Sequence, residues 1–236
     1  MERIDKLLAS TGRWSRRDVK LLVKNGRVFV NGAPTAAPDL KVDPNAVSLA
    51  VDGKAIAVRK FTYVMMNKPA GVLSATEDSR QKTVLDLLPP DLQRQGLFPV
   101  GRLDKDSEGL LLLTNDGDLT HRLLSPKKHV DKVYYIRTDQ PMSEEDCAAF
   151  EAGITLADGT VCLPAHLELL GSGNEALVTL HEGKFHQIKR MTAARGTAVC
   201  QLKRLSMGTL VLDDALKLGE FRLLTGEEVS NLGGNG

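Results

Sequence analysis

The first quarter of the chain has the hydrophobic pattern of a small domain built from helices and a hairpin. Apolar residues recur at helical spacing over residues 2–10 and again over residues 16–24. Ser15 precedes the second segment, and serine is favoured at helix N-caps. Alternating apolar residues then predict short strands at 27–30 and 47–51. We therefore expect two helices followed by a small sheet.

Beyond residue 60 the pattern changes, and strands are expected to outnumber helices. Strands are predicted at residues 61–67, 110–113, 130–137, 161–170, 175–180 and 199–205. Helices are predicted at residues 83–88, 117–124, 143–150, 187–194 and from 225 onward. The fold class is therefore α+β. We expect one domain over 1–58, a larger one over 59–231 and a disordered tail at 232–236.

The charge is distributed unevenly along the chain. Residues 1–60 contain 12 Lys and Arg against 6 Asp and Glu, a net charge of +6, while residues 61–236 have a net charge of −5. A basic first domain favours a polyanionic partner, although a solvated helix face is the commoner cause of a charge cluster.

The remaining composition excludes several classes of protein. No apolar run reaches the ~18 residues that a membrane span requires. The three cysteines are far apart, which argues against disulfides and a zinc site and favours a cytoplasmic protein. The five histidines show no ligand spacing, so no metal is expected.

The segment GRLDKDSEGLLLLTNDG, residues 101–117, combines an acidic loop with a buried strand. Asp104 stands shortly before the apolar run at 110–113, where a rigid element can hold a carboxylate in a fixed position. A surface turn capped by Asp104 or Asp106 would give the same pattern, and such turns are common. The residues alone leave both interpretations open.

Two small helices followed by NGRVFVNG resemble the S4 RNA-binding domain over residues 1–48. The resemblance implies that a basic helical face meets RNA phosphates, which provide affinity and salt dependence but little sequence information. The residues of this face are Arg3, Lys6, Arg16, Arg17, Lys20 and Lys24.

Three further motifs occur in a family order: GRLDKDSEGLLLLTNDG, LSPKKHVDKVYYI and EGKFHQIKRM. With NKPAGVLSA at residues 67–75, they resemble the RsuA/RluB/RluE/RluF group of pseudouridine synthases. The resemblance covers nearly the whole chain. It implies a mixed, mostly antiparallel sheet in two subdomains with an RNA cleft between them, and its small-subunit (16S rRNA) branch is the most similar.

The resemblance also assigns roles to single residues. Asp104 would be the catalytic aspartate, Tyr134 would stack on the target uracil, and Lys189 would pair with Asp104. Arg102 would lie near the backbone of the flipped nucleotide and Ile188 against its base. The isomerisation adds and removes no group, so it requires neither a cofactor nor a metal. Asp106 and Glu108 are expected to order the loop through backbone hydrogen bonds.

The function expected from the resemblance is isomerisation of a uridine in 16S rRNA, free or in a pre-30S particle, by a cytoplasmic monomer. A 23S rRNA enzyme of the same group is the near alternative. A non-catalytic S4-type RNA-binding or ribosome-assembly protein would use residues 1–48 alone. A glycoside hydrolase would need two carboxyl groups opposed across a sugar at ~5–9 Å, which neighbouring loop residues seldom achieve.

Overall fold

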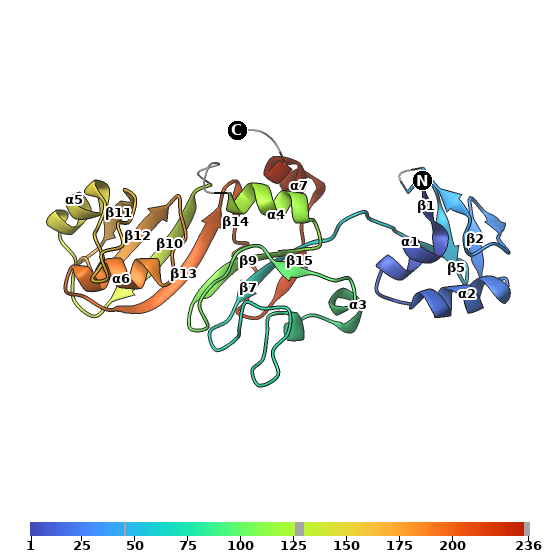
Figure 1. The fold of residues 1–236 in the computed structure, drawn as a ribbon, viewed down its shortest axis with the longest axis horizontal. Coiled ribbons are helices and arrows are strands. Elements are labelled where there is room, and N and C mark those ends of the chain that lie inside the picture. The colour runs from blue at the N-terminus through green and yellow to red at the C-terminus, as the bar shows by residue number, and fades with distance from the viewer. Residues whose placement is uncertain (45, 126–129, 234–236) are drawn as a thin grey trace. The chain divides into compact units, whose positions relative to one another are not determined.

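A computed structural model describes residues 1–44, 46–125 and 130–233 of the 236-residue chain. The chain forms two compact units (Figure 1). Unit 1 comprises Met1–Thr62 and Leu88–Phe98, and unit 2 comprises Tyr63–Leu87 and Pro99–Gly236. Residues 88–98, which we expected in the larger domain, cluster with the first unit.

Unit 1 contains the predicted helices and hairpin. Its elements are β1 (Glu2–Arg3), α1 (Ile4–Ser10), α2 (Arg16–Lys24), β2 (Val28–Val30), β3 (Ala33–Pro34), β4 (Lys41–Val42), β5 (Leu49–Val51), β6 (Lys54–Ile56) and α3 (Pro90–Gln93). Ser15 and Asp18 form a reciprocal capping box at the start of α2. The sheet has the order β3-β2-β5-β6, and its Val28, Leu49 and Val51 share a hydrophobic core with the two helices.

Unit 2 is organised around one mixed sheet of nine strands. Its central path has the order β11-β12-β10-β13-β9-β7-β15, while β14 pairs with β13 and β8 with β9. The strands are β7 (Tyr63–Lys68), β8 (Phe98–Pro99), β9 (Glu108–Thr114), β10 (Lys132–Thr138), β11 (His166–Leu170), β12 (Glu175–Leu180), β13 (Val199–Met207), β14 (Leu210–Val211) and β15 (Phe221–Leu223). The helical elements are η1 (Leu85–Leu87), α4 (Gly117–Leu124), α5 (Glu144–Ala152), α6 (Gln187–Ala194) and α7 (Gly226–Gly233).

Strands β9 and β13 pair in parallel in the middle of the sheet, with Arg204 opposite Gly109. Gly109 has φ +99°, and a Cβ atom there would lie 2.3 Å from the carbonyl oxygen of Arg204. A larger residue therefore could not occupy this position without displacing the strand. The buried Arg204 guanidinium adds a hydrogen bond of 2.7 Å to the carbonyl of Leu110.

Two hydrophobic cores lie on either side of this junction. Helices α5 and α6 pack against β10–β13, where Phe150, Ile136 and Met191 are fully buried (Figure 1). Helices α4 and α7 pack against β7 and β9, with Leu119 and Leu232 in the second core. The structure therefore has the mixed sheet and the two subdomains that the resemblance implied, on one continuous sheet.

Three sequence predictions differ from the structure. The helix expected at 83–88 is one 3₁₀ turn, because Asp86 accepts hydrogen bonds from the backbone and hydroxyl of Thr83 and Pro89-Pro90 follows. The strand expected at 161–170 begins only at His166. A disordered tail was expected over residues 232–236, but α7 runs to Gly233 and Leu232 is buried. Residues 234–236 lie outside the described residues. No helix in the described ranges is long and apolar enough to cross a membrane.

Candidate active site

The loop that carries Asp104 lies immediately before β9 and is anchored on both sides. Ser74 brackets Leu103, since its hydroxyl donates to the Leu103 carbonyl at 2.8 Å and accepts from the Leu103 amide at 3.1 Å. Within the loop, the Ser107 amide donates to the Asp104 carbonyl at 3.1 Å. The Asp104 side chain is about a quarter exposed, so its carboxylate reaches solvent from a fixed backbone.

Lys68, at the end of β7, donates hydrogen bonds to the backbone of this loop. Its amine lies 3.1 Å from the carbonyl oxygen of Asp104, 3.3 Å from that of Lys105 and 2.8 Å from that of Ser107, and it also contacts Pro69. Burial lowers the pKa of Lys68 to about 8, although nearby carboxylates oppose this effect. The sequence pattern of NKPAG indicates only a turn, and it does not reveal the role of Lys68 because the contacts of this residue lie almost 40 residues away in the sequence.

Lys189 of α6 connects two carboxylates of the loop. Its amine lies 3.1 Å from Asp104 and 2.5 Å from Asp106. Burial opposes the charge of Lys189, but the hydrogen bonds to Asp106 and Asp104 outweigh it and raise the pKa of the amine. The same contact lowers the pKa of Asp106. Asp106 was expected to bond to the backbone, and its pairing with Lys189 is a contact between distant segments that the sequence alone could not reveal.

His186 approaches Asp104 from the same segment, with 3.5 Å between its Nε2 atom and the carboxylate. The residue has φ +50° and ψ +35°, a left-handed conformation that is uncommon for a residue with a side chain and costs of order 1 kcal/mol. Such strain persists where surrounding contacts over-determine the backbone. His186 was not among the predicted site residues, because residue spacing does not reveal a left-handed backbone.

Gln187 supplies the contacts that hold this backbone. Its buried amide donates to Glu182 at 2.6 Å, and its carbonyl oxygen accepts from the Lys184 amide at 2.9 Å. Lys184 also pairs with Glu182. Contacts among its own side chains therefore fix the conformation of the segment EGKFHQ, after which α6 begins at Gln187.

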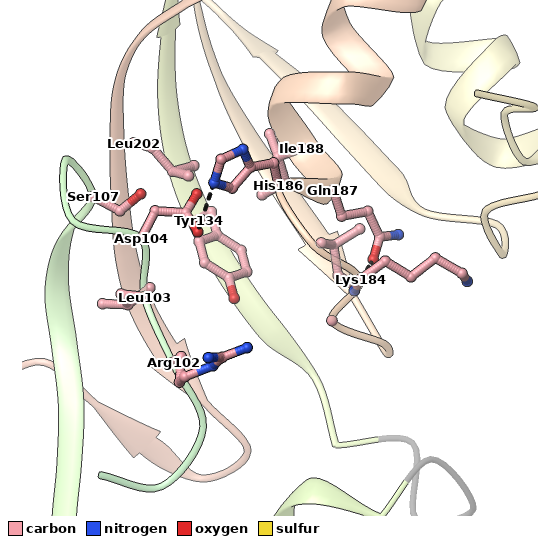
Figure 2. Close-up of a pocket in the computed structure, with 12 residues that line it drawn as sticks. Arg102, Leu103, Asp104, Ser107, Tyr134, Lys184, His186, Gln187, Ile188 and Leu202 are labelled. Carbon is pink, nitrogen blue, oxygen red and sulfur yellow. Dashed lines mark hydrogen bonds and ion pairs between the residues drawn. The ribbon is translucent and has the colours of Figure 1, made fainter. Parts of the chain in front are cut away.

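These segments surround an open pocket. Its lining residues are Arg102, Leu103, Asp104, Ser107, Tyr134, Leu180, Gly183, Lys184, His186, Gln187, Ile188 and Leu202. Figure 2 shows Asp104, Tyr134 and His186 directed toward one space, with Arg102 at its edge. The lining combines apolar and charged side chains.

The four other residues proposed from the resemblance therefore lie around Asp104. Tyr134 of β10 and Ile188 of α6 are 8% and 3% exposed and belong to the adjacent core. Arg102 is exposed at the pocket edge, and Lys189 contacts the Asp104 carboxylate. Residues 126–129 of the motif LSPKKHVDKVYYI lie outside the described residues.

The six basic residues proposed for RNA binding divide into three kinds. Asp5, which is fully buried, accepts hydrogen bonds from both Arg3 and Arg16. Lys6 pairs with Glu2 at 3.3 Å. The other three, Arg17, Lys20 and Lys24, are exposed on α2 and form one positively charged face of this helix.

Comparison with known proteins identifies the family. A model of the RNA pseudouridylate synthase family matches residues 62–194, and a model of the S4 domain matches residues 2–48. A Bacillus subtilis protein named uncharacterized RNA pseudouridine synthase YtzG is 52% identical over 230 residues, with 96% of each chain covered. The chain belongs to the RNA pseudouridylate synthases.

Other relatives of this pseudouridine synthase cover its full length. The protein named ribosomal small subunit pseudouridine synthase A is 38% identical in Vibrio cholerae, over 98% of this chain and 99% of its own. The Pseudomonas aeruginosa protein of that name is 39% identical over 98% of this chain and 100% of its own. A crystal structure of a pseudouridylate synthase matches with a TM-score of 0.70 and 32% identity, over 98% of this chain and 100% of its own.

Proposed function

We propose that this pseudouridine synthase isomerises one uridine of ribosomal RNA in the small subunit and that Asp104 is its catalytic residue. The observation that carries the proposal is the Asp104 carboxylate, held in the pocket between Lys189 at 3.1 Å and His186 at 3.5 Å. Two relatives named for the ribosomal small subunit, each matched along nearly the whole chain, support the choice of RNA.

The reaction requires one carboxylate and no net addition of atoms. The N1–C1′ bond of the uridine breaks, the uracil turns, and a C5–C1′ bond forms while the C5 proton moves to N1. An ionised Asp104 can begin it by attacking C1′, which displaces uracil; C5 of the uracil then attacks C1′ and displaces the carboxylate. Alternatively, Asp104 removes the proton on C2′ as uracil leaves, which gives a glycal, and the proton returns to C2′ when C5 bonds to C1′. Both routes use the carboxylate, and the Lys189 amine lies 3.1 Å from it.

The other pocket residues provide binding for a uridine that has left its helix. Extruding a base breaks its stacking, so the enzyme must supply a replacement. We assign this role to the Tyr134 ring, with Ile188 against the other part of the base. Arg102 at the pocket edge is assigned to the phosphate of the flipped nucleotide.

We further assign residues 1–58 to RNA binding and residues 59–231 to catalysis. The basic residues of the first part would contact phosphates, with Arg17, Lys20 and Lys24 the most accessible. A ribosomal substrate places the enzyme in the cytoplasm. We propose that the enzyme acts as a monomer.

Mapping pseudouridine in rRNA from cells that lack the enzyme tests the proposal. We expect one small-subunit site to be lost and to return with the wild type but not with Asp104→Asn, whose kcat should fall at least about 10³-fold. Asp214→Asn is the matched control, because Asp214 is an exposed carboxylate outside the pocket. Loss at a large-subunit site would contradict the choice of RNA, and full rescue by Asp104→Asn would contradict the catalytic assignment.

A further inference from the structure

The most exposed aromatic ring near the pocket belongs to Phe185. This residue is 71% exposed, and it directly precedes His186, which lines the pocket and contacts Asp104. The two rings are stacked, with centroids 3.8 Å apart and planes inclined by 19°. One face of the Phe185 ring thus rests on His186, while most of its surface remains open to solvent.

This arrangement is imposed by the local backbone. His186 is in the left-handed conformation at the start of α6, and the bonds between Gln187, Glu182 and Lys184 fix the loop on either side. The Phe185 carbonyl also lies 3.5 Å from Arg190 in the next turn of α6. The ring is therefore presented from a constrained segment, which limits the entropy lost when a ligand stacks on it.

RNA offers a specific partner for such a ring. When a uridine leaves the stack, the neighbouring base loses one of its stacking partners. Exposed aromatic side chains commonly replace base stacking in RNA complexes, because every base has a π-face. The Asp104–His186–Phe185 sequence of contacts runs from the reacting carboxylate to the outside of the pocket.

We propose that the exposed ring of Phe185 stacks on the base of the nucleotide next to the flipped uridine. The inference rests on the uridine isomerisation proposed above and extends the binding site by one nucleotide. The enzyme would then recognise a short single-stranded element rather than the target uridine alone. Because stacking tolerates all four bases, Phe185 would provide affinity and positioning with little sequence preference.

A mutant cycle between the protein and the RNA tests the proposal. The substrate is an rRNA fragment that the wild type modifies, with a single abasic nucleotide placed on one or the other side of the target uridine. Phe185→Ala should lower kcat/KM on the intact fragment about 5- to 150-fold, the range for loss of one stacked base, while Phe185→Trp should retain most of the activity. On one side of the target uridine, the abasic nucleotide should lower kcat/KM of the wild type by a similar factor and should not lower kcat/KM of Phe185→Ala any further.

Two controls separate this role from others. Val211→Ala removes another exposed apolar side chain, 64% exposed and outside the pocket, and should leave kcat/KM unchanged. If the ring only held His186 in position, Phe185→Ala would lower the single-turnover rate at saturating RNA. The effects of Phe185→Ala and of the abasic nucleotide on kcat/KM would then be independent and would multiply, whichever side of the uridine the abasic nucleotide occupied. That result, or wild-type kcat/KM in Phe185→Ala, would overturn the proposal. A wild type without activity on any rRNA fragment would overturn both this inference and the proposed function.

Discussion

At the scale of single residues, the position of Asp104 depends on a buried amine far away in the sequence. Lys68 is fully buried and contacts the carbonyl oxygens of Asp104, Lys105 and Ser107. Burying an ammonium group is itself costly, so its value lies in fixing the loop rather than in stabilising the fold. Misplacement of a reacting group by about 1 Å can cost 10²-fold in rate.

We therefore predict that Lys68→Met affects catalysis more than stability. The substitution keeps the apolar stem but removes the donor, and the single-turnover rate on an rRNA fragment should fall about 10- to 100-fold. The melting temperature should change little, because loss of the hydrogen bonds is offset by relief of the buried charge. Lys105→Met makes the same chemical change at an exposed position of the same loop and should retain the wild-type rate. An unchanged rate in Lys68→Met would show that the loop holds itself.

At the scale of elements, local patterns predicted much of the fold. The apolar run after Glu108 became β9, and Ser15 caps α2 as expected. The parallel junction of β9 with β13 left no such signal, since it depends on contacts between segments almost 100 residues apart. The roles of His186 and Lys68 could not be predicted either, because they also depend on contacts between distant segments. Asp104 and Tyr134 were proposed from the family resemblance, since their chemistry alone left other interpretations open.

The C-terminal helix illustrates a local signal that the structure extends. Thr225 and Glu228 form reciprocal capping contacts at the start of α7. Glu228 also accepts two hydrogen bonds from Arg222 of β15, at 2.7 and 2.8 Å. These bonds, led by the contact with Arg222, lower the pKa of Glu228 to about 2.

We predict that Glu228→Gln lowers the free energy of unfolding by about 1–3 kcal/mol at pH 7, because a neutral amide loses the charge-assisted pairing. A depressed carboxyl pKa stabilises the fold above the ordinary value of 4.5, and this contribution disappears as the pH falls toward about 2. The difference between variant and wild type should therefore shrink from pH 5 to pH 2.5 in urea unfolding. Glu227→Gln, at an exposed neighbouring position, should have little effect at any pH. A constant difference for Glu228→Gln across this range would contradict the assigned cause.

At the scale of the whole molecule, charge is divided along the chain rather than balanced within it. Residues 1–60 have a net charge of +6 and residues 61–236 of −5, so the total of +1 conceals the basic region. Part of the positive charge is already engaged, since Arg3 and Arg16 share the buried Asp5. Lys20 and Lys24 form no ion pair among the residues that the structure describes. These two lysines on α2 are therefore available for phosphates.

We predict that the Lys20→Gln/Lys24→Gln double variant weakens RNA binding and reduces its salt dependence. Each lost phosphate contact should lower the slope of log K against log salt concentration by about 0.7–0.9, so the pair should lower it by about 1.5. The measurement is binding of an rRNA fragment between about 50 and 200 mM salt. Lys54→Gln/Lys217→Gln changes the net charge by the same amount at two other exposed lysines and should keep the wild-type slope. If both double variants lowered the slope equally, the total charge rather than the α2 face would govern binding. If only the α2 variant lowered the slope, and its single-turnover rate at saturating RNA equalled that of the wild type, the two lysines would act in RNA binding and not in the isomerisation step.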